Sequence, residues 1–198
     1  MTDNIVKGLG CLFSFIFLMV SCAGTDLTET QVDDAYKGKP VSDILIIAVT
    51  GNEHNRRSYE RKFVANLKSV GVEAVASEKS ISMPGDLKIK KETILSAVDQ
   101  YKNDAVIITQ LVGKETKDVY QRGGVTRYGY FGYTRNPGYS NTTRKVRLET
   151  NLYDAKTGEL IWSGISKTLS KDSTDRIMND VIKTVIANLK KNKLIAPK

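Results

Sequence analysis

Residues 43–50 read DILIIAVT, and residues 105–112 show the same pattern as AVIITQLV. Both runs have the length of a strand and are mostly apolar, instead of alternating between apolar and polar side chains. Such runs are typical of strands buried on both faces, as in parallel sheets that crossover helices cover on both sides. We therefore expect them to form the centre of an α/β sheet.

The chain between these runs has the spacing of two helices separated by a short strand at residues 72–76. Apolar residues recur three or four positions apart, as on one face of a helix, and Gly71 ends the first helix. This alternation of strands and helices predicts right-handed crossovers. The residues that mark the two helix faces are Tyr59, Phe63, Leu67 and Val70, and then Ile94, Val98 and Tyr101.

The second half of the chain has the pattern of an antiparallel hairpin. Residues 146–152 alternate in polarity, residues 154–158 (DAKTG) form a turn, and residues 159–169 return as the partner strand. A last helix runs from about Ser173 to Lys191, with Ser173 or Asp172 as its cap. The predicted fold class is α/β (α+β), with a mixed sheet in the order β-α-β-α-β, then an antiparallel hairpin and a carboxy-terminal α-helix.

The amino terminus has the features of a secretory signal. Residues 9–20 read LGCLFSFIFLMV, an uncharged apolar run that follows Lys7. A membrane-spanning helix needs ~20 such residues, so this run fits the apolar region of a cleaved signal peptide over residues 1–21 better than an anchor.

The signal ends in Met19-Val20-Ser21-Cys22, followed by Ala23 and Gly24. The sequence resembles a bacterial lipoprotein precursor, whose lipobox is an aliphatic residue, two small residues and cysteine. The resemblance implies a diacylglyceryl thioether on Cys22, cleavage before it and acylation of the new amino group, so that the membrane is a partner through the lipid anchor. Ala23, rather than Asp, resembles lipoproteins sent to the outer membrane of a Gram-negative cell, anchored there and facing the periplasm. The alternative is ordinary cleavage near Ala23, with Cys22 incidental.

On this resemblance the mature chain has no cysteine left for other chemistry, because Cys11 lies in the signal and Cys22 would carry the lipid. This excludes disulfides, thiol catalysis and cysteine-ligated metals. Residues 22–42 are polar and acidic and predict a flexible tether before a single domain at residues 43–198. The alternative is an amino-terminal strand at the domain edge near Ala35-Tyr36.

Residues 152–162, LYDAKTGELIW, combine a turn with a strand that carries tryptophan. With the element order, this segment resembles an envelope group that includes the amino-terminal domain of TolB and the periplasmic domain of the curli-secretion lipoprotein. The resemblance implies an α/β fold and an envelope role, and it brings no catalytic residues.

A ligand site is expected beyond the first apolar run, where residues 51–57 read GNEHNRR. The loop after a strand's carboxyl end is where open α/β sheets bind ligands. The alternative is that the histidine faces water or caps a turn. The chain has no second histidine for a metal pair, lacks the HEXXH and GXSXG motifs, and scatters its carboxylates, so we expect no enzyme activity, metal or cofactor. The candidate residues are Asn52, Glu53, His54, Arg56 and Arg57.

The most distinctive segment is residues 120–141, YQRGGVTRYGYFGYTRNPGYSN, which we expect to be a long basic aromatic loop. Residues 114–147 hold eight basic and two acidic side chains, which is most of the chain's net charge of +8. Tyrosine offers rigid contact area, and arginine offers planar donors. The candidate contact residues are Arg122, Arg127, Tyr128, Tyr130, Phe131, Tyr133, Arg135 and Tyr139.

Three interpretations of this loop remain open: a flexible or solvated hairpin extension, contact with a protein partner or a second copy, and contact with anionic glycans or lipid headgroups. Nucleic acid is not expected as a partner, because an exported chain meets little of it. The predicted function is a membrane-anchored envelope lipoprotein that acts as a non-enzymatic binding or scaffolding module. The alternatives are a subunit of an outer-membrane secretion or surface-appendage assembly, and a small-ligand or enzymatic domain that uses residues 52–57.

Overall fold

The computed structural model describes residues 25–33, 36, 38–121, 125–128, 132–135, 139–170 and 173–197. For residues 118–144, the description covers the backbone. The strands are β1 (Thr25–Val32), β2 (Asp43–Val49), β3 (Glu73–Ala76), β4 (Ala105–Gln121), β5 (Val125–Tyr128), β6 (Gly132–Arg135), β7 (Tyr139–Asp154) and β8 (Leu160–Ser170). The helices are α1 (Glu53–Lys68), α2 (Lys91–Tyr101) and α3 (Thr174–Lys191), with a 3-10 helix η1 (Ser77–Lys79).

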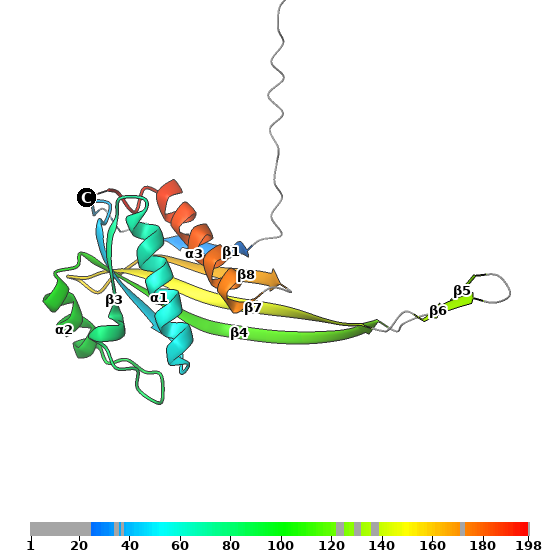
Figure 1. Cartoon of the computed structure of the whole chain (residues 1–198). Coiled ribbons are helices and arrows are strands. Elements are labelled where there is room, and N and C mark those ends of the chain that lie inside the picture. Colours follow the sequence, from blue (N-terminus) through cyan, green and yellow to red (C-terminus); the bar gives the residue numbers. More distant parts are fainter. Residues whose placement is uncertain are drawn as a thin grey trace, which may run out of the picture.

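Six strands form one mixed sheet in the order β1-β8-β7-β4-β2-β3, and β5 pairs with β6 in a separate two-stranded sheet. Helices α1 and α3 lie side by side on one face of the large sheet, and α2 lies on the other (Figure 1). The α/β prediction is confirmed, including the central order β-α-β-α-β, the antiparallel hairpin β7–β8 and the carboxy-terminal helix.

The parallel centre is buried on both faces, as its apolar sequence predicted. Strand β2 pairs in parallel with β3 and with β4. Ile44 and Ile46 pack into the core under α1 and α3, whereas Leu45 and Ile47 pack toward α2, and all four are 0% exposed. Burial of a side chain of this size stabilises a fold by about 1.5–3 kcal/mol, so this strand anchors both layers.

Trp162 fixes how α3 sits on the antiparallel half of the sheet. Its side chain is fully buried in the core beneath α3, and its Nε1 donates a hydrogen bond to Asn188 Oδ1 at 3.1 Å. The ring lies over Gly164 so closely that a Cβ there would be 2.5 Å from it. Glycine is therefore required at this position of β8.

The amino-terminal tether needs a correction, because residues 25–32 form β1 at the sheet edge. The strand pairs antiparallel with β8, from Thr25 opposite Thr168 to Val32 opposite Trp162. Leu27 and Val32 pack against the core. The alternative of an amino-terminal edge strand matches this arrangement, although the strand lies before Ala35-Tyr36. Two apolar residues suffice here because β8 supplies the backbone hydrogen bonds.

Candidate functional site

The basic aromatic segment is an extension of the sheet. Strand β4 pairs with β7 out to Gln121 opposite Tyr139, whereas β8 pairs with β7 only as far as Ser170 opposite Arg144. Beyond that point β4 and β7 continue as a two-stranded ribbon, and β5 and β6 lie past its end (Figure 1). We call residues 117–143 the arm. We expected residues 120–141 to form a loop. Every residue of this segment that the structure describes lies in a strand.

The predicted contact residues are distributed along the arm. Arg127 lies opposite Tyr133 in the β5–β6 ladder, and Tyr128 lies opposite Gly132. Arg135 lies opposite Val125 in the same ladder, and Tyr139 begins β7. Arg122, Tyr130 and Phe131 lie outside the described residues, as does Cys22.

Both outer edges of the arm lack a neighbouring strand within the described part of the chain. Strand β2 accompanies β4 only to Val49 opposite Gln110, and β8 leaves β7 at Arg144. Unpaired backbone N–H and C=O groups on such edges are a template for another strand. The arm can therefore bind through its backbone as well as through its side chains.

An ion pair and two exposed leucines lie near the base of the arm, with Leu111 on the face of α1 and α3 and Leu169 beside the ion pair on the other face. Lys145 forms an ion pair with Glu115 at 3.3 Å, opposite it in the ladder. Leu111 and Leu169 are exposed by 52% and 57%. An exposed leucine is ordinary by itself. Leu111 lies on β4, which continues into the arm, and Leu169 lies opposite Lys145 on β8, which ends at the base of the arm.

The predicted ligand loop is mostly the first turn of α1. Asn52 caps the helix, because its Oδ1 accepts a hydrogen bond from the Asn55 amide at 2.9 Å. Glu53 pairs with Arg57 at 3.0 Å along the exposed side of the helix. His54 is exposed in the same turn, which agrees with the alternative in which it faces water.

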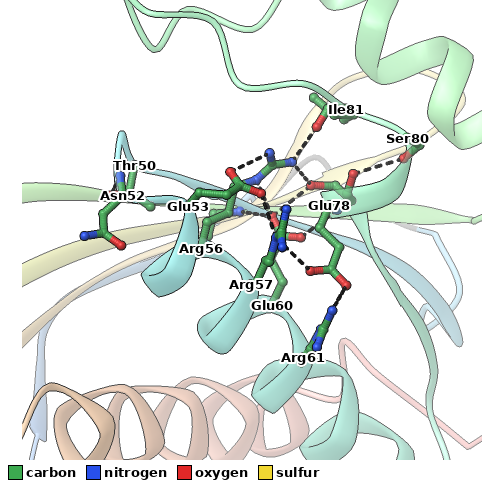
Figure 2. A network of polar contacts seen from close by, with 12 residues as sticks. Thr50, Asn52, Glu53, Arg56, Arg57, Glu60, Arg61, Glu78, Ser80 and Ile81 are labelled. Carbon is green, nitrogen blue, oxygen red and sulfur yellow. Dashed lines mark hydrogen bonds and ion pairs between the residues drawn. The ribbon is translucent and has the colours of Figure 1, made fainter.

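Arg56 belongs to a buried network that joins α1 to β2 and η1 (Figure 2). Arg56 is 1% exposed and Glu60 is 0% exposed, and the Arg56 Nε donates to Glu60 Oε1 at 3.1 Å. The Arg56 Nη2 donates to Ser77 Oγ at 3.0 Å and to the Ile81 carbonyl at 2.7 Å. Its guanidinium is thus occupied within the fold, and the geometry gives it a structural role.

The Glu60 carboxylate accepts hydrogen bonds from several neighbours. The backbone N–H of Ala48 donates at 3.0 Å, the Ser77 hydroxyl at 2.8 Å and the Glu78 amide at 2.9 Å. The pKa of Glu60 is raised above its ordinary value, because the effect of burial outweighs the lowering by the hydrogen bonds from Ala48, Ser77 and Arg56 and by the Arg56 charge. The sequence analysis included Arg56 among the candidate ligand residues but did not identify Glu60. The available signal was that Glu60 follows Arg56 by four residues, the spacing of neighbours on one helix face.

A pocket of about 290 Å³ lies at the carboxyl edge of the parallel strands. The end of β2, the middle of β4, strand β7 and the first turns of α1 and α3 line it. Of the predicted ligand segment, only Asn55 reaches the lining, and Asn55 was not itself among the predicted residues. Tyr59 also lines the pocket and donates to Thr109 Oγ1 at 3.3 Å, and burial raises its pKa to about 12, so its hydroxyl stays neutral.

Within the described ranges, no group of three or more His, Cys, Asp or Glu side chains is placed to hold a metal ion. None of the helices in those ranges is long and apolar enough to cross a membrane.

No protein-family model and no curated protein sequence matches the chain. Among solved structures, the PelC dodecamer from Paraburkholderia phytofirmans is 12% identical with a TM-score of 0.49, over 87% of this chain and 99% of that one. Lipoprotein GNA1162 from Neisseria meningitidis is 14% identical with a TM-score of 0.43, over 76% and 99%. A neuraminyllactose-binding hemagglutinin homolog from Helicobacter pylori is 14% identical with a TM-score of 0.33, over 79% and 90%. Likenesses at these values carry no argument about function.

Proposed function

We propose that this chain is a lipid-anchored envelope protein that binds or scaffolds a partner through the arm, without enzymatic chemistry. Residues 1–21 act as a cleaved signal peptide, and Cys22 carries the lipid that holds the chain in the outer membrane. The partner is an envelope protein or a second copy of this chain. The observation that carries the proposal is the arm itself, a basic aromatic ribbon with open strand edges.

The position of the anchor relative to the arm supports this function. Cys22 precedes β1 by three residues, which extend over at most ~10 Å. Thr25 lies opposite Thr168, two residues before the end of β8, and that end lies opposite Arg144 at the base of the arm. The lipidated terminus therefore enters the sheet at the same end of the strands from which the arm extends. The arm would accordingly act close to the membrane surface.

The arm's chemistry suits a partner with an acidic surface. Its residues include Arg122, Arg127 and Arg135 together with six aromatic side chains, and Asp118 is its one acidic residue. Aromatic and arginine side chains carry much of the binding energy in protein interfaces. Anionic glycans and lipid headgroups share the negative charge but offer no strand to pair with the open edges.

A second candidate function is a subunit of a secretion or surface-appendage assembly. The open edges of β4 and β7 favour it, because strands from neighbouring copies can pair along such edges. The alternative of a ligand or enzymatic site at residues 52–57 receives less support, since Asn52, Glu53 and Arg56 make contacts within the fold.

Shortening the arm tests the proposal in living cells. Gln121 and Tyr139 lie opposite each other, so replacing residues 122–138 with Asn-Gly closes the ribbon with a two-residue turn. We expect the full chain to give a crosslinked complex with its partner or with a second copy, and the shortened chain to lose at least about nine-tenths of it, as hot-spot removal does. Thermal unfolding of both chains shows whether the rest of the domain, outside the arm, remains folded.

The matched control removes three positive charges elsewhere, through Lys183→Gln, Lys190→Gln and Lys191→Gln on the exposed side of α3. This variant should keep the complex. Equal complex formation by the shortened chain would contradict a binding role for the arm, and loss in the α3 variant would show that charge alone is responsible.

A further inference from the structure

The pocket that lies where β2 ends beside β4 has the features of a ligand site that is independent of the arm and the anchor. We propose that it binds a small amphipathic anion, an aliphatic carboxylate whose chain lies among apolar side chains and whose carboxylate meets Lys114. This inference goes beyond the binding function proposed above and does not rest on it.

The position of the pocket in the topology is the first argument. From β2 the chain passes through α1 to β3 on one side of β2, and from β3 it passes through α2 to β4 on the other side. Helices α1 and α2 lie on opposite faces (Figure 1). The strand order therefore reverses between β2 and β4, and ligands bind outside the carboxyl ends of strands at such switch points. Val49, which ends β2, lines the pocket with Gln110, its partner on β4, and β4 itself continues to Gln121.

The lining indicates an aliphatic body. Val49, Leu111, Val146, Leu148, Ile177 and Met178 come together there from β2, β4, β7 and α3. Leu111 is 52% exposed, so the alkyl chain of a bound ligand would cover apolar surface that now faces water. The volume of about 290 Å³ lies at the lower end of the range for small-molecule sites, ~300–1,000 Å³, so the ligand is small.

The charge of the lining indicates an anion. No acidic side chain occurs among the lining residues, and Lys114 is the charged one. Lys114 is exposed, and its ammonium group has no carboxylate partner within the described part of the chain. Thr50, Asn55 and Thr174 add neutral polar groups around the apolar centre. An apolar pocket with one cation and a few hydrogen-bonding groups matches a fatty-acid-like carboxylate.

Calorimetric titration with decanoate and with decanol tests this inference. The protein is the mature chain, residues 22–198 with Cys22→Ser, which retains every residue that the structure describes. We expect saturable binding of decanoate. Lys114→Gln should weaken decanoate binding about tenfold, the order of one charge-assisted hydrogen bond, and should leave decanol binding unchanged. Leu111→Gln should weaken both ligands.

A second apolar pocket provides matched controls. It lies between α2, β4 and β7, is about 280 Å³ in volume, and is lined by Lys91 and by Leu95, which is 39% exposed. Lys91→Gln and Leu95→Gln should leave both affinities unchanged. Absence of saturable decanoate binding, or an equal loss for decanol in Lys114→Gln, would overturn the inference. Loss in the Lys91 or Leu95 variants would also overturn it, because the ligand would then occupy the other pocket.

Discussion

A Glu60→Ala variant is expected to lose about 3–5 kcal/mol of unfolding free energy, the cost of removing one partner of a buried ion pair. Arg56 would remain buried with only the half-exposed Glu53, at 3.6 Å, as a counter-charge, and the amides of Ala48 and Glu78 would lose their acceptor. Urea unfolding of the mature chain measures the loss. Because the network joins α1, β2 and η1, we expect a lower midpoint of a single transition.

Two further variants separate the buried pair from charge in general. Glu73→Gln removes the exposed partner of Lys68, outside the network, and should change the unfolding free energy by less than about 1 kcal/mol. Replacing both members of the buried pair, Arg56→Met with Glu60→Leu, should recover part of the loss, because no uncompensated buried charge then remains although the amides of Ala48 and Glu78 still lack their acceptor. A Glu60→Ala variant as stable as the parent chain would contradict the structural role of this pair.

The second large effect is expected at Cys22. Each buried methylene adds ~0.8 kcal/mol of membrane affinity, so the lipid expected on this residue would hold nearly all of the protein on membranes. Cys22→Ser, combined with an ordinary secretory signal in place of residues 1–21, should move the protein almost entirely into the soluble periplasmic fraction. Fractionation after a high-salt wash is the measurement, because salt removes protein held only by its basic residues.

Incorporation of a labelled fatty acid gives a separate readout of the same site. The parent chain should incorporate the label and the Cys22→Ser chain should not. Ser21→Ala keeps a small residue before the cysteine and should behave like the parent. Persistence of the Cys22→Ser chain on washed membranes would contradict lipid anchoring at this position.

The parallel core was predictable because its sequence pattern is local. Ile44 through Ile47 are apolar without interruption, and Tyr59, Phe63 and Leu67 mark a helix face within a few turns. The same holds for the cap at Ser173, whose side chain accepts from the Arg176 amide. In each case neighbouring residues carry the signal.

Strand β1 and the arm were harder to predict because strand pairing depends on distant partners. In β1, Leu27 and Val32 are the only aliphatic residues, and its hydrogen bonds come from β8, more than 120 residues later. The frequent glycines of the arm are typical of a loop. Strand β4 nevertheless continues past a bulge between Leu111 and Gly113 and pairs with β7 into the arm. Composition does not reveal pairing of this kind.

The candidate sites show the same limit. Arg56 and Glu60 are polar residues that the sequence places on a helix, and only their contacts with Ser77 and Ile81 show that they are buried. The pocket collects residues from five separate elements, so no short motif could indicate it. The anchor, by contrast, was inferred from one contiguous motif around Cys22.

Site-specific photocrosslinking in living cells tests most directly whether the arm is the contact surface. A photoreactive residue at position 127 or 133 would lie in the β5–β6 ladder. The same residue at position 156 would lie in the exposed turn between β7 and β8, at the end of the sheet away from the arm. We expect a crosslinked partner or second copy from positions 127 and 133 and none from position 156. Crosslinks from position 156 with none from the arm would contradict the proposed function.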